Sequence, residues 1–151
     1  MADTTTVLND ALYAQLQKQT FVLLHTVDAD SGSPTTSAIS WIYAVDPTRL
    51  RLALDARSRL VANMAKSPET SVTLFGGETV HAIYGKAVIV TDHLEGVPFP
   101  LACVDIEITA VRDAMFYGAR LISGPEVEKT YDKRAADRLD GQVFEAMRKA
   151  Q

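Results

Sequence analysis

The stretch Asp55-Ala-Arg-Ser-Arg-Leu-Val-Ala-Asn-Met-Ala-Lys-Ser-Pro68 decides the fold of this chain, because it combines the pattern of a short helix with a basic start. Pro68 ends the helix, since a proline keeps the residue before it out of the helical conformation. Four apolar residues at helical spacing give the segment one apolar face: Leu60, Val61, Met64 and Ala65. We therefore expect a helix that begins after Ser58 and ends before Pro68.

The start of this helix is a candidate anion site. Ser58 is the expected N-cap, and Arg57 and Arg59 lie on either side of it. The first turn offers unpaired backbone N–H groups, the positive end of the helix dipole, a hydroxyl group and two guanidinium groups, which together suit a phosphate. The alternative interpretation is an ordinary capped surface helix, because a helix N-terminus binds an anion only where one is delivered.

The composition indicates one globular domain that covers residues 1–151. Of the 151 residues, 47 % are hydrophobic and 23 % are charged, which suits one well-buried core. No apolar run has the length of a membrane span and the N-terminus lacks the pattern of a secretory signal, so we expect a cytoplasmic protein that does not contact membranes. The net charge of −4, without an extended basic surface, disfavours nucleic acid as a partner.

The single cysteine, Cys103, excludes an internal disulfide, and its place in an alternating strand favours a packing role. Redox chemistry would therefore depend on a cofactor. His25, His81 and His93 share no metal-ligand spacing, so no metal site is predicted. The sequence also lacks a nucleophile elbow and a phosphate-binding glycine loop, and it gives no support to hydrolase chemistry.

The rest of the pattern predicts a mainly β fold with flanking helices. An amphipathic helix is expected at about residues 7–18. Turn formers separate about six antiparallel strands, among them roughly 20–27, 39–45, 49–55, 70–75, 79–91 and 104–110, with Gly85 at a bulge or a close backbone approach. The turn formers at 28–34 indicate a hairpin loop after the first strand. Strands of this number and length suit a small barrel. Gly124-Pro125 and a four-residue apolar repeat predict a helical tail at about 125–149, which Gly141 could divide in two.

Several of these segments, taken in order, resemble the pyridoxamine 5′-phosphate oxidase family. They are Ser58-Arg59, Pro68 at the helix end, Thr70-Ser-Val-Thr-Leu-Phe75 and Tyr84-Gly-Lys-Ala-Val88, preceded by Leu24-His-Thr-Val27 and Gly32-Ser-Pro34. The resemblance covers roughly residues 20–112. It implies a six-stranded antiparallel split β-barrel that binds FMN, with the N-terminal and C-terminal helices packed outside, and a homodimer with cofactor sites built from both chains.

The resemblance also assigns roles to individual residues. Ser58 and Arg59 correspond to the residues that hold the flavin phosphate. The segment whose backbone faces the isoalloxazine ring corresponds to Thr36, Ser37, Ala38, Ile39 and Ser40. Two positions depart from the family pattern, because a phosphate-binding lysine is Leu60 here and a flavin-binding glutamine is Val80. Losing a charge-assisted contact costs about 1.5–3 kcal/mol unless Arg57 or Lys66 replaces the lysine, so weak or absent cofactor is an alternative.

The resemblance implies an FMN-dependent oxidoreductase that acts on an unidentified small molecule with an unidentified electron donor. Pyridoxamine phosphate oxidase activity itself is not expected, because the C-terminus lacks the arginine-rich, proline-containing segment of those enzymes. The alternative is a non-catalytic protein that binds or senses a flavin, a deazaflavin or haem on the same barrel. His81 bears on the haem alternative, since some relatives bind haem through a single histidine.

Large apolar side chains give two further expectations. Trp41, Tyr84 and Tyr117 could stack on an aromatic ligand, but for Trp41 a place in the core is the favoured interpretation. Strands 39–45 and 104–110 together carry more large apolar side chains than the interior of one small barrel holds. Because exposed apolar surface of this kind marks an interface, the sequence independently predicts a homodimer.

Overall fold

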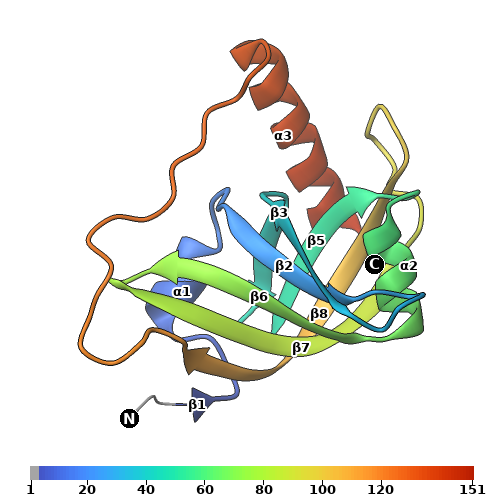
Figure 1. Cartoon of the computed structure of the whole chain (residues 1–151). Coiled ribbons are helices and arrows are strands. Elements are labelled where there is room, and N and C mark those ends of the chain that lie inside the picture. Colours follow the sequence, from blue (N-terminus) through green and yellow to red (C-terminus); the bar gives the residue numbers. More distant parts are fainter. Residues whose placement is uncertain (1–3) are drawn as a thin grey trace.

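The computed structural model describes residues 4–151 and contains one antiparallel sheet with three helices around it (Figure 1). The helices are α1 (Asp10–Gln15), α2 (Arg59–Lys66) and α3 (Lys133–Lys149). The strands are β1 (Thr4–Thr5), β2 (Val22–Val27), β3 (Pro34–Ile39), β4 (Ile42–Asp46), β5 (Arg49–Asp55), β6 (Glu69–Gly76), β7 (Thr79–Thr91) and β8 (Leu101–Asp113). Their order in the sheet is β3-β2-β6-β7-β8-β5-β4, and β1 pairs with β8.

The strands agree with the sequence pattern except in number. About six strands were predicted and eight are described, because Pro34–Ile39 forms β3 as a strand of its own and because β1 adds a short pair to β8. The strand predicted at 39–45 begins only at Ile42, as β4. The bounds of β7 are those predicted. The register shifts between Tyr84 and Gly85, and a Cβ at Gly85 would lie 2.5 Å from the backbone oxygen of Glu107. Gly85 therefore marks both a bulge and a close backbone approach.

One face of the sheet surrounds the main apolar core. Buried side chains from six strands meet there with those of α1 and α2. Fully buried members include Leu24, Ile42, Leu50, Leu52, Val72, Leu74, Ile83 and Ile106. Their burial is the main source of stability for the sheet, since each large apolar side chain contributes roughly 1.5–3 kcal/mol when removed from water.

The opposite face of β4, β5 and β8 is covered by α3 (Figure 1). Residues 50–54 of β5 are buried on both faces, because the leucines point into the main core while Arg51 and Ala53 lie against α3. Val143 and Met147 of α3 pack there with Tyr43, Leu101 and Cys103. Cys103 is fully buried in this cluster, which confirms its predicted packing role, and the burial raises the pKa of its thiol to about 11.

Two helix boundaries differ from the prediction. The N-terminal helix is shorter than 7–18, because Asn9 accepts a hydrogen bond from the Leu12 N–H at 2.8 Å and so caps a helix that begins at Asp10. The C-terminal helix begins at Lys133, where Asp132 accepts from the Ala135 N–H, and not at Gly124-Pro125. Residues 114–132 form neither helix nor strand. Gly141 does not divide α3.

Across the described residues 4–151, none of the helices has both the length and the apolar character needed to cross a membrane.

Candidate functional site

The predicted N-cap of α2 is present in the structure. Ser58 has an extended backbone conformation, and its hydroxyl oxygen accepts a hydrogen bond from the Leu60 N–H at 3.0 Å. The helix begins at Arg59, as its sequence pattern predicts, and ends before Pro68 with Ser67 as the C-cap. Asp55, at the end of β5, accepts from the Ser58 N–H through its backbone oxygen at 2.9 Å. The start of α2 is therefore held directly beyond the end of β5.

The guanidinium of Arg59 is paired with two carboxylates of the β2–β3 loop. Its Nη2 lies 2.7 Å from Asp28 Oδ1 and 3.0 Å from Asp30 Oδ2, and its Nε donates to Asp28 Oδ1 at 2.8 Å. The side chain of Asp28 is only 11 % exposed, whereas that of Asp30 is 83 % exposed. Sequence analysis treated both aspartates as turn formers and missed this contact, which joins residues about thirty positions apart.

The β2–β3 loop fixes Asp28 in place. Asp28 Oδ2 accepts hydrogen bonds from the backbone N–H groups of Asp30 and Ser31 and from the Ser31 hydroxyl. The Ser31 N–H and the Arg59 guanidinium are the main causes that lower the pKa of Asp28 to about 2. This carboxylate is therefore ionised at any physiological pH, and it faces the predicted phosphate site with a full negative charge.

The other two candidate cations near α2 also have partners in the protein. Arg57 pairs with Asp55 at 3.2 Å, which raises the pKa of Arg57 and lowers that of Asp55. Lys66 Nζ donates to the backbone oxygen of Ala29 at 2.6 Å, so it reaches the β2–β3 loop and not the N-terminus of its own helix.

A buried asparagine ties the same loop to α2. The Asn63 side chain is 1 % exposed, accepts from the Ala29 N–H at 2.8 Å and donates to Thr26 Oγ1 at 3.0 Å. Sequence analysis did not single out Asn63, because an asparagine on a short amphipathic helix carries no signal of its own. Together with Lys66 and Arg59, it makes the loop and the start of α2 one structural unit.

The second predicted group lies on β3, which the loop leads into. Thr36, Ser37, Ala38 and Ile39 belong to this strand, and Ser40 follows its end. Ile39 packs against the main core, while Thr36 and Ala38 are exposed on the other face. β3 pairs with β2 and stands at the end of the described strand order, so half of its backbone polar groups point away from any strand partner. The loop thus connects β3 to α2, and so does Thr35 of β3, whose hydroxyl lies 2.7 Å from that of Thr26, which accepts from the Asn63 amide.

His25 extends the polar surface around β3. Its Nδ1 lies 3.2 Å from Thr36 Oγ1 and its Nε2 lies 2.8 Å from Thr73 Oγ1, so three side chains on β3, β2 and β6 form one hydrogen-bonded row. Sequence analysis considered His25 only as a metal ligand. No group of three or more metal-ligating side chains is assembled anywhere in residues 4–151.

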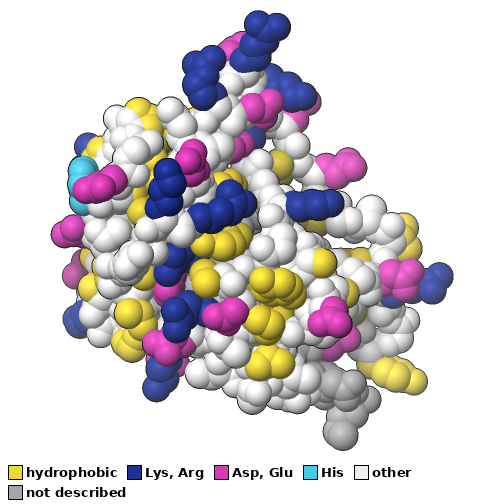
Figure 2. All heavy atoms as spheres, turned by 180° about the vertical axis from the view of Figure 1, so that it is seen from behind, with side chains coloured by type: hydrophobic (Ala, Val, Ile, Leu, Met, Phe, Trp, Pro, Cys, Tyr) yellow, Lys and Arg dark blue, Asp and Glu magenta, His cyan; other side chains and the backbone are white. Residues whose placement is uncertain are grey.

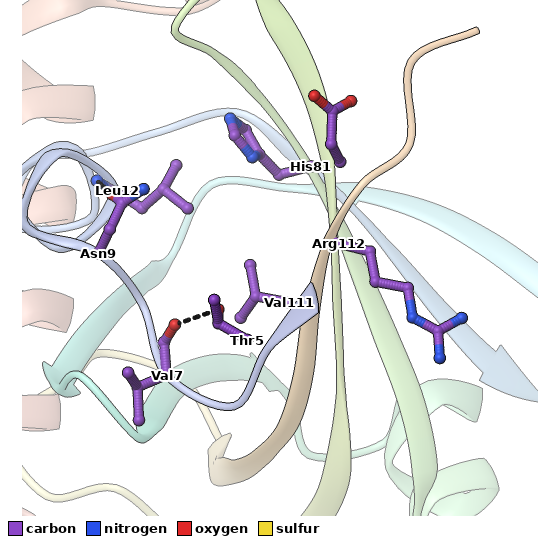
Figure 3. A pocket seen from close by; sticks show the side chains of 8 residues that line it. Thr5, Val7, Asn9, Leu12, His81, Val111 and Arg112 are labelled. Carbon is purple, nitrogen blue, oxygen red and sulfur yellow. Dashed lines mark hydrogen bonds between the residues drawn. The ribbon is translucent and has the colours of Figure 1, made fainter. Parts of the chain in front are cut away.

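His81 lines a separate small cavity beneath β1 and α1 (Figure 3). The cavity has a volume of about 220 Å³ and is also lined by Thr5, Val7, Asn9, Leu12, Val111, Arg112 and Asp113. His81 Nε2 lies 3.0 Å from the Gly76 carbonyl oxygen and must donate to it, because a carbonyl can only accept. The volume falls below the roughly 300–1,000 Å³ typical of ligand pockets.

The aromatic candidates divide between core and surface. Trp41 is partly buried beneath α3, where its Nε1–H donates to Asp140 Oδ1 at 2.8 Å. Its core interpretation is therefore confirmed. Tyr84 is partly exposed on the sheet, with Arg112 over its ring, and Tyr117 is fully exposed in the segment 114–132.

Comparison with known proteins places this geometry in a family. The model of the pyridoxamine 5′-phosphate oxidase family matches residues 8–103, which is more than half of the chain. The chain belongs to the pyridoxamine 5′-phosphate oxidase family. The match covers β2 to α2 and therefore includes the loop, β3 and the start of α2. No curated protein sequence matches the chain.

Several solved structures share the fold of this chain at low sequence identity. A pyridoxamine 5′-phosphate oxidase-like protein from Lactobacillus delbrueckii superposes with a TM-score of 0.60 and 22 % identity, over 71 % of this chain and 94 % of the other. HupZ from Group A Streptococcus superposes with a TM-score of 0.59 and 15 % identity, over 78 % of this chain and 99 % of HupZ. An F420 reductase superposes with a TM-score of 0.55 and 16 % identity, over 65 % of this chain and 93 % of the reductase. At these identities the likeness shows the fold alone.

Because the family binds FMN, we can ask whether the residues at β3 and α2 suit the ring and the phosphate of this cofactor. The β3 segment fits the ring, because its free edge offers backbone donors and acceptors beside an exposed face. The phosphate end fits less well. Arg59 pairs with Asp28 and Asp30, Arg57 pairs with Asp55, and Lys66 donates to the backbone oxygen of Ala29. Leu60 packs against the core in place of the family's lysine, and the backbone oxygen of Val80 accepts from the Ala114 N–H. In this arrangement the site carries no net positive charge for a phosphate dianion.

Proposed function

We propose that this member of the family is a flavin-binding redox protein whose cofactor lies along β3 and ends at the start of α2. One observation carries the proposal: the capped start of α2 and the exposed edge of β3 lie on either side of the β2–β3 loop. All three segments fall within the residues that match the family. A bound flavin supplies electron or hydride transfer, which no side chain of this chain can supply alone.

The residues of the chain would bind and orient the cofactor. Exposed backbone groups of β3 suit the polar edge of a planar heterocycle, and the Ser58 hydroxyl and Arg59 lie at the other end of the site. The row formed by Thr36, His25 and Thr73 adds polar side chains next to the β3 segment. FMN is the expected flavin because it is the cofactor of the family, and the substrate and the electron donor are small molecules still to be identified.

The homodimer is part of the same proposal. Several large apolar side chains are exposed on the single chain, among them Phe116, Tyr117, Ile122, Val127 and Tyr131 in the segment 114–132. Figure 2 also shows hydrophobic side chains gathered between charged ones on the face opposite to that of Figure 1. Such surface is what an interface between two copies buries. Sedimentation at micromolar concentration should give a dimer, and a monomer would contradict this part of the proposal.

A second candidate function is cofactor binding without turnover. Leu60 at the position of the family's lysine and the paired Arg59 favour it, because both weaken the hold on a phosphate. A deazaflavin is a variant of this candidate that an F420 reductase of the same fold makes worth testing. Reduction of bound flavin by NADH or NADPH and its reoxidation by an acceptor at a catalytic rate would exclude a binding-only role.

Titration of the cofactor-free protein tests the proposal. Added FMN or riboflavin should quench the fluorescence of the flavin or of Trp41 and should raise the melting temperature, because a ligand that binds only the folded state stabilises it. Purified protein that is colourless and shows no thermal shift with either flavin would contradict the proposal.

A further inference from the structure

The start of α2 is electrostatically balanced before any ligand arrives. The three basic side chains of α2 and of the residues just before it are each held by the protein: Arg59 by Asp28 and Asp30, Arg57 by Asp55, and Lys66, in the last turn of α2, by the backbone of the β2–β3 loop. Three carboxylates therefore accompany three cations. A phosphate dianion that approaches Arg59 meets Asp28 and Asp30 as competitors for the same guanidinium.

Asp28 is built into this position. Its two carboxylate oxygens have different partners, because Oδ2 accepts three hydrogen bonds from the loop and Oδ1 faces Arg59. The side chain is nearly buried, unlike those of ordinary surface ion pairs. Asp30 adds a second, exposed carboxylate at 3.0 Å from the same guanidinium.

The loop that carries both aspartates is held to α2 by contacts that do not involve Arg59. Asn63 binds the backbone N–H of Ala29, and Lys66 binds its backbone oxygen. Because Ala29 lies between the aspartates, these two contacts hold the backbone that carries both carboxylates beside α2 independently of Arg59.

We propose that Asp28 and Asp30 are specificity-determining residues that lower the affinity of this site for the phosphate of a flavin. The inference rests on the proposed function. If the inference holds, the chain discriminates only weakly between FMN and riboflavin. The attraction between the phosphate and Arg59 is then offset by the repulsion between the phosphate and the two nearby carboxylates. At separations of a few ångströms in a solvent-exposed site, removing both charges should strengthen binding of a dianion by about tenfold, and less at high salt.

Asparagine variants test this with little structural change. In Asp28→Asn the side-chain oxygen can keep the loop hydrogen bonds of Oδ2 while the amide turns toward Arg59, and Asp30→Asn changes a side chain that is almost fully exposed. The double variant should bind FMN about tenfold more tightly than the wild type and riboflavin within about twofold of it. Asp132→Asn is the matched control, because it removes one negative charge from the N-cap of α3 and keeps a good capping residue.

If Asp28→Asn fails to fold, Asp30→Asn alone should still raise the FMN affinity by about threefold. If every one of these variants that folds binds FMN with the same affinity as the wild type, the inference is overturned, while the proposal that the chain binds a flavin still stands. A wild-type preference of a hundredfold or more for FMN over riboflavin would also overturn the inference.

Inorganic phosphate separates this inference from the proposed function. Its binding is followed by NMR through the Nε–H signal of Arg59, without any flavin. Tighter phosphate binding in the double variant than in the wild type, together with no binding of either flavin, would support the role of the aspartates and contradict the flavin proposal. Unchanged phosphate affinity would overturn the inference whatever the flavins do.

Discussion

Arg51 and Arg59 both pair with aspartates, but the two clusters lie in opposite environments. Arg51 is 7 % exposed and binds both carboxylate oxygens of Asp105, at 2.7 and 3.0 Å, while its Nη1 donates to the backbone oxygens of Met147 and Ala150 at the end of α3. Arg59 has a side chain that is 62 % exposed and bridges two aspartates of one loop.

The difference shows which cluster can exchange its partners. Arg51 donates four hydrogen bonds, three of them buried, so removing one member of this cluster leaves a charge or a carbonyl without its partner and away from water. Around Arg59 water is close, and an exposed pair of this kind contributes little to stability. The Arg51 cluster therefore fixes α3 on the sheet, whereas the exposed Arg59 cluster suits the ligand selection that we propose for it.

The largest expected effect comes from Arg51→Met. It should lower the free energy of unfolding by about 3–5 kcal/mol, because, among the described residues, the buried Asp105 then keeps only the half-exposed Arg49, at 3.8 Å, as a charged partner. Urea denaturation followed by the fluorescence of Trp41 measures the change. Adding Asp105→Leu should recover part of the loss. A loss below about 1 kcal/mol for the single variant would remove the contrast between the two clusters.

A smaller loss is expected at the other contact between α3 and the sheet. The buried Asp140 accepts from the Trp41 indole N–H and pairs with Lys129 at 3.0 Å. Asp140→Ala should cost about 1–3 kcal/mol, because the indole N–H loses its partner. Lys129→Ala is the control and should cost less, because the lysine can be replaced by water. Equal losses would mean that the indole contact contributes nothing measurable.

At Arg59 the effects on stability and on binding should separate. Arg59→Gln should change the free energy of unfolding by no more than about 0.5–1 kcal/mol, as for other exposed ion pairs. Arg59→Glu should abolish FMN binding and leave the dimer intact, because it repels the phosphate without touching an apolar contact. Undiminished FMN binding in this variant would place the cofactor elsewhere on the chain.

The smallest effect concerns acid stability. The pKa of Asp28 falls from 3.8 to about 2 on folding, so its contribution to stability is complete above about pH 4 and is lost as the pH falls toward 2. The melting temperature of the wild type should therefore decrease more steeply between pH 4 and pH 2 than that of Asp28→Asn. Parallel curves would show that the Ser31 and Arg59 contacts do not hold this carboxylate in solution.

The sequence predicted those parts of the fold that depend on local pattern. The cap of α2, the bounds of β7 and the bulge at Gly85 follow from residue types within a few positions of one another. The predicted start of α3 was wrong. Pro125 suits the first position of a helix, but Asp132 supplies the cap at which the helix begins. Propensity alone does not choose between two such starts.

The sequence predicted only part of the candidate site. Ser58 and Arg59 stand in a recognisable order, but the aspartates that pair with Arg59 come from a loop about thirty residues earlier, and nothing in a cluster of turn formers indicates a distant partner. The burial of Arg51 was equally hidden, since its alternation in β5 gives its face and not the helix that covers it.

Native mass spectrometry of the purified protein tests the central claim, that this chain binds a flavin, most directly. The account predicts a non-covalent adduct with the mass of FMN or of riboflavin on each chain of a dimer, lost when the protein is unfolded. An adduct with the mass of haem or of a deazaflavin, or a protein that stays unliganded when either flavin is added, would contradict it.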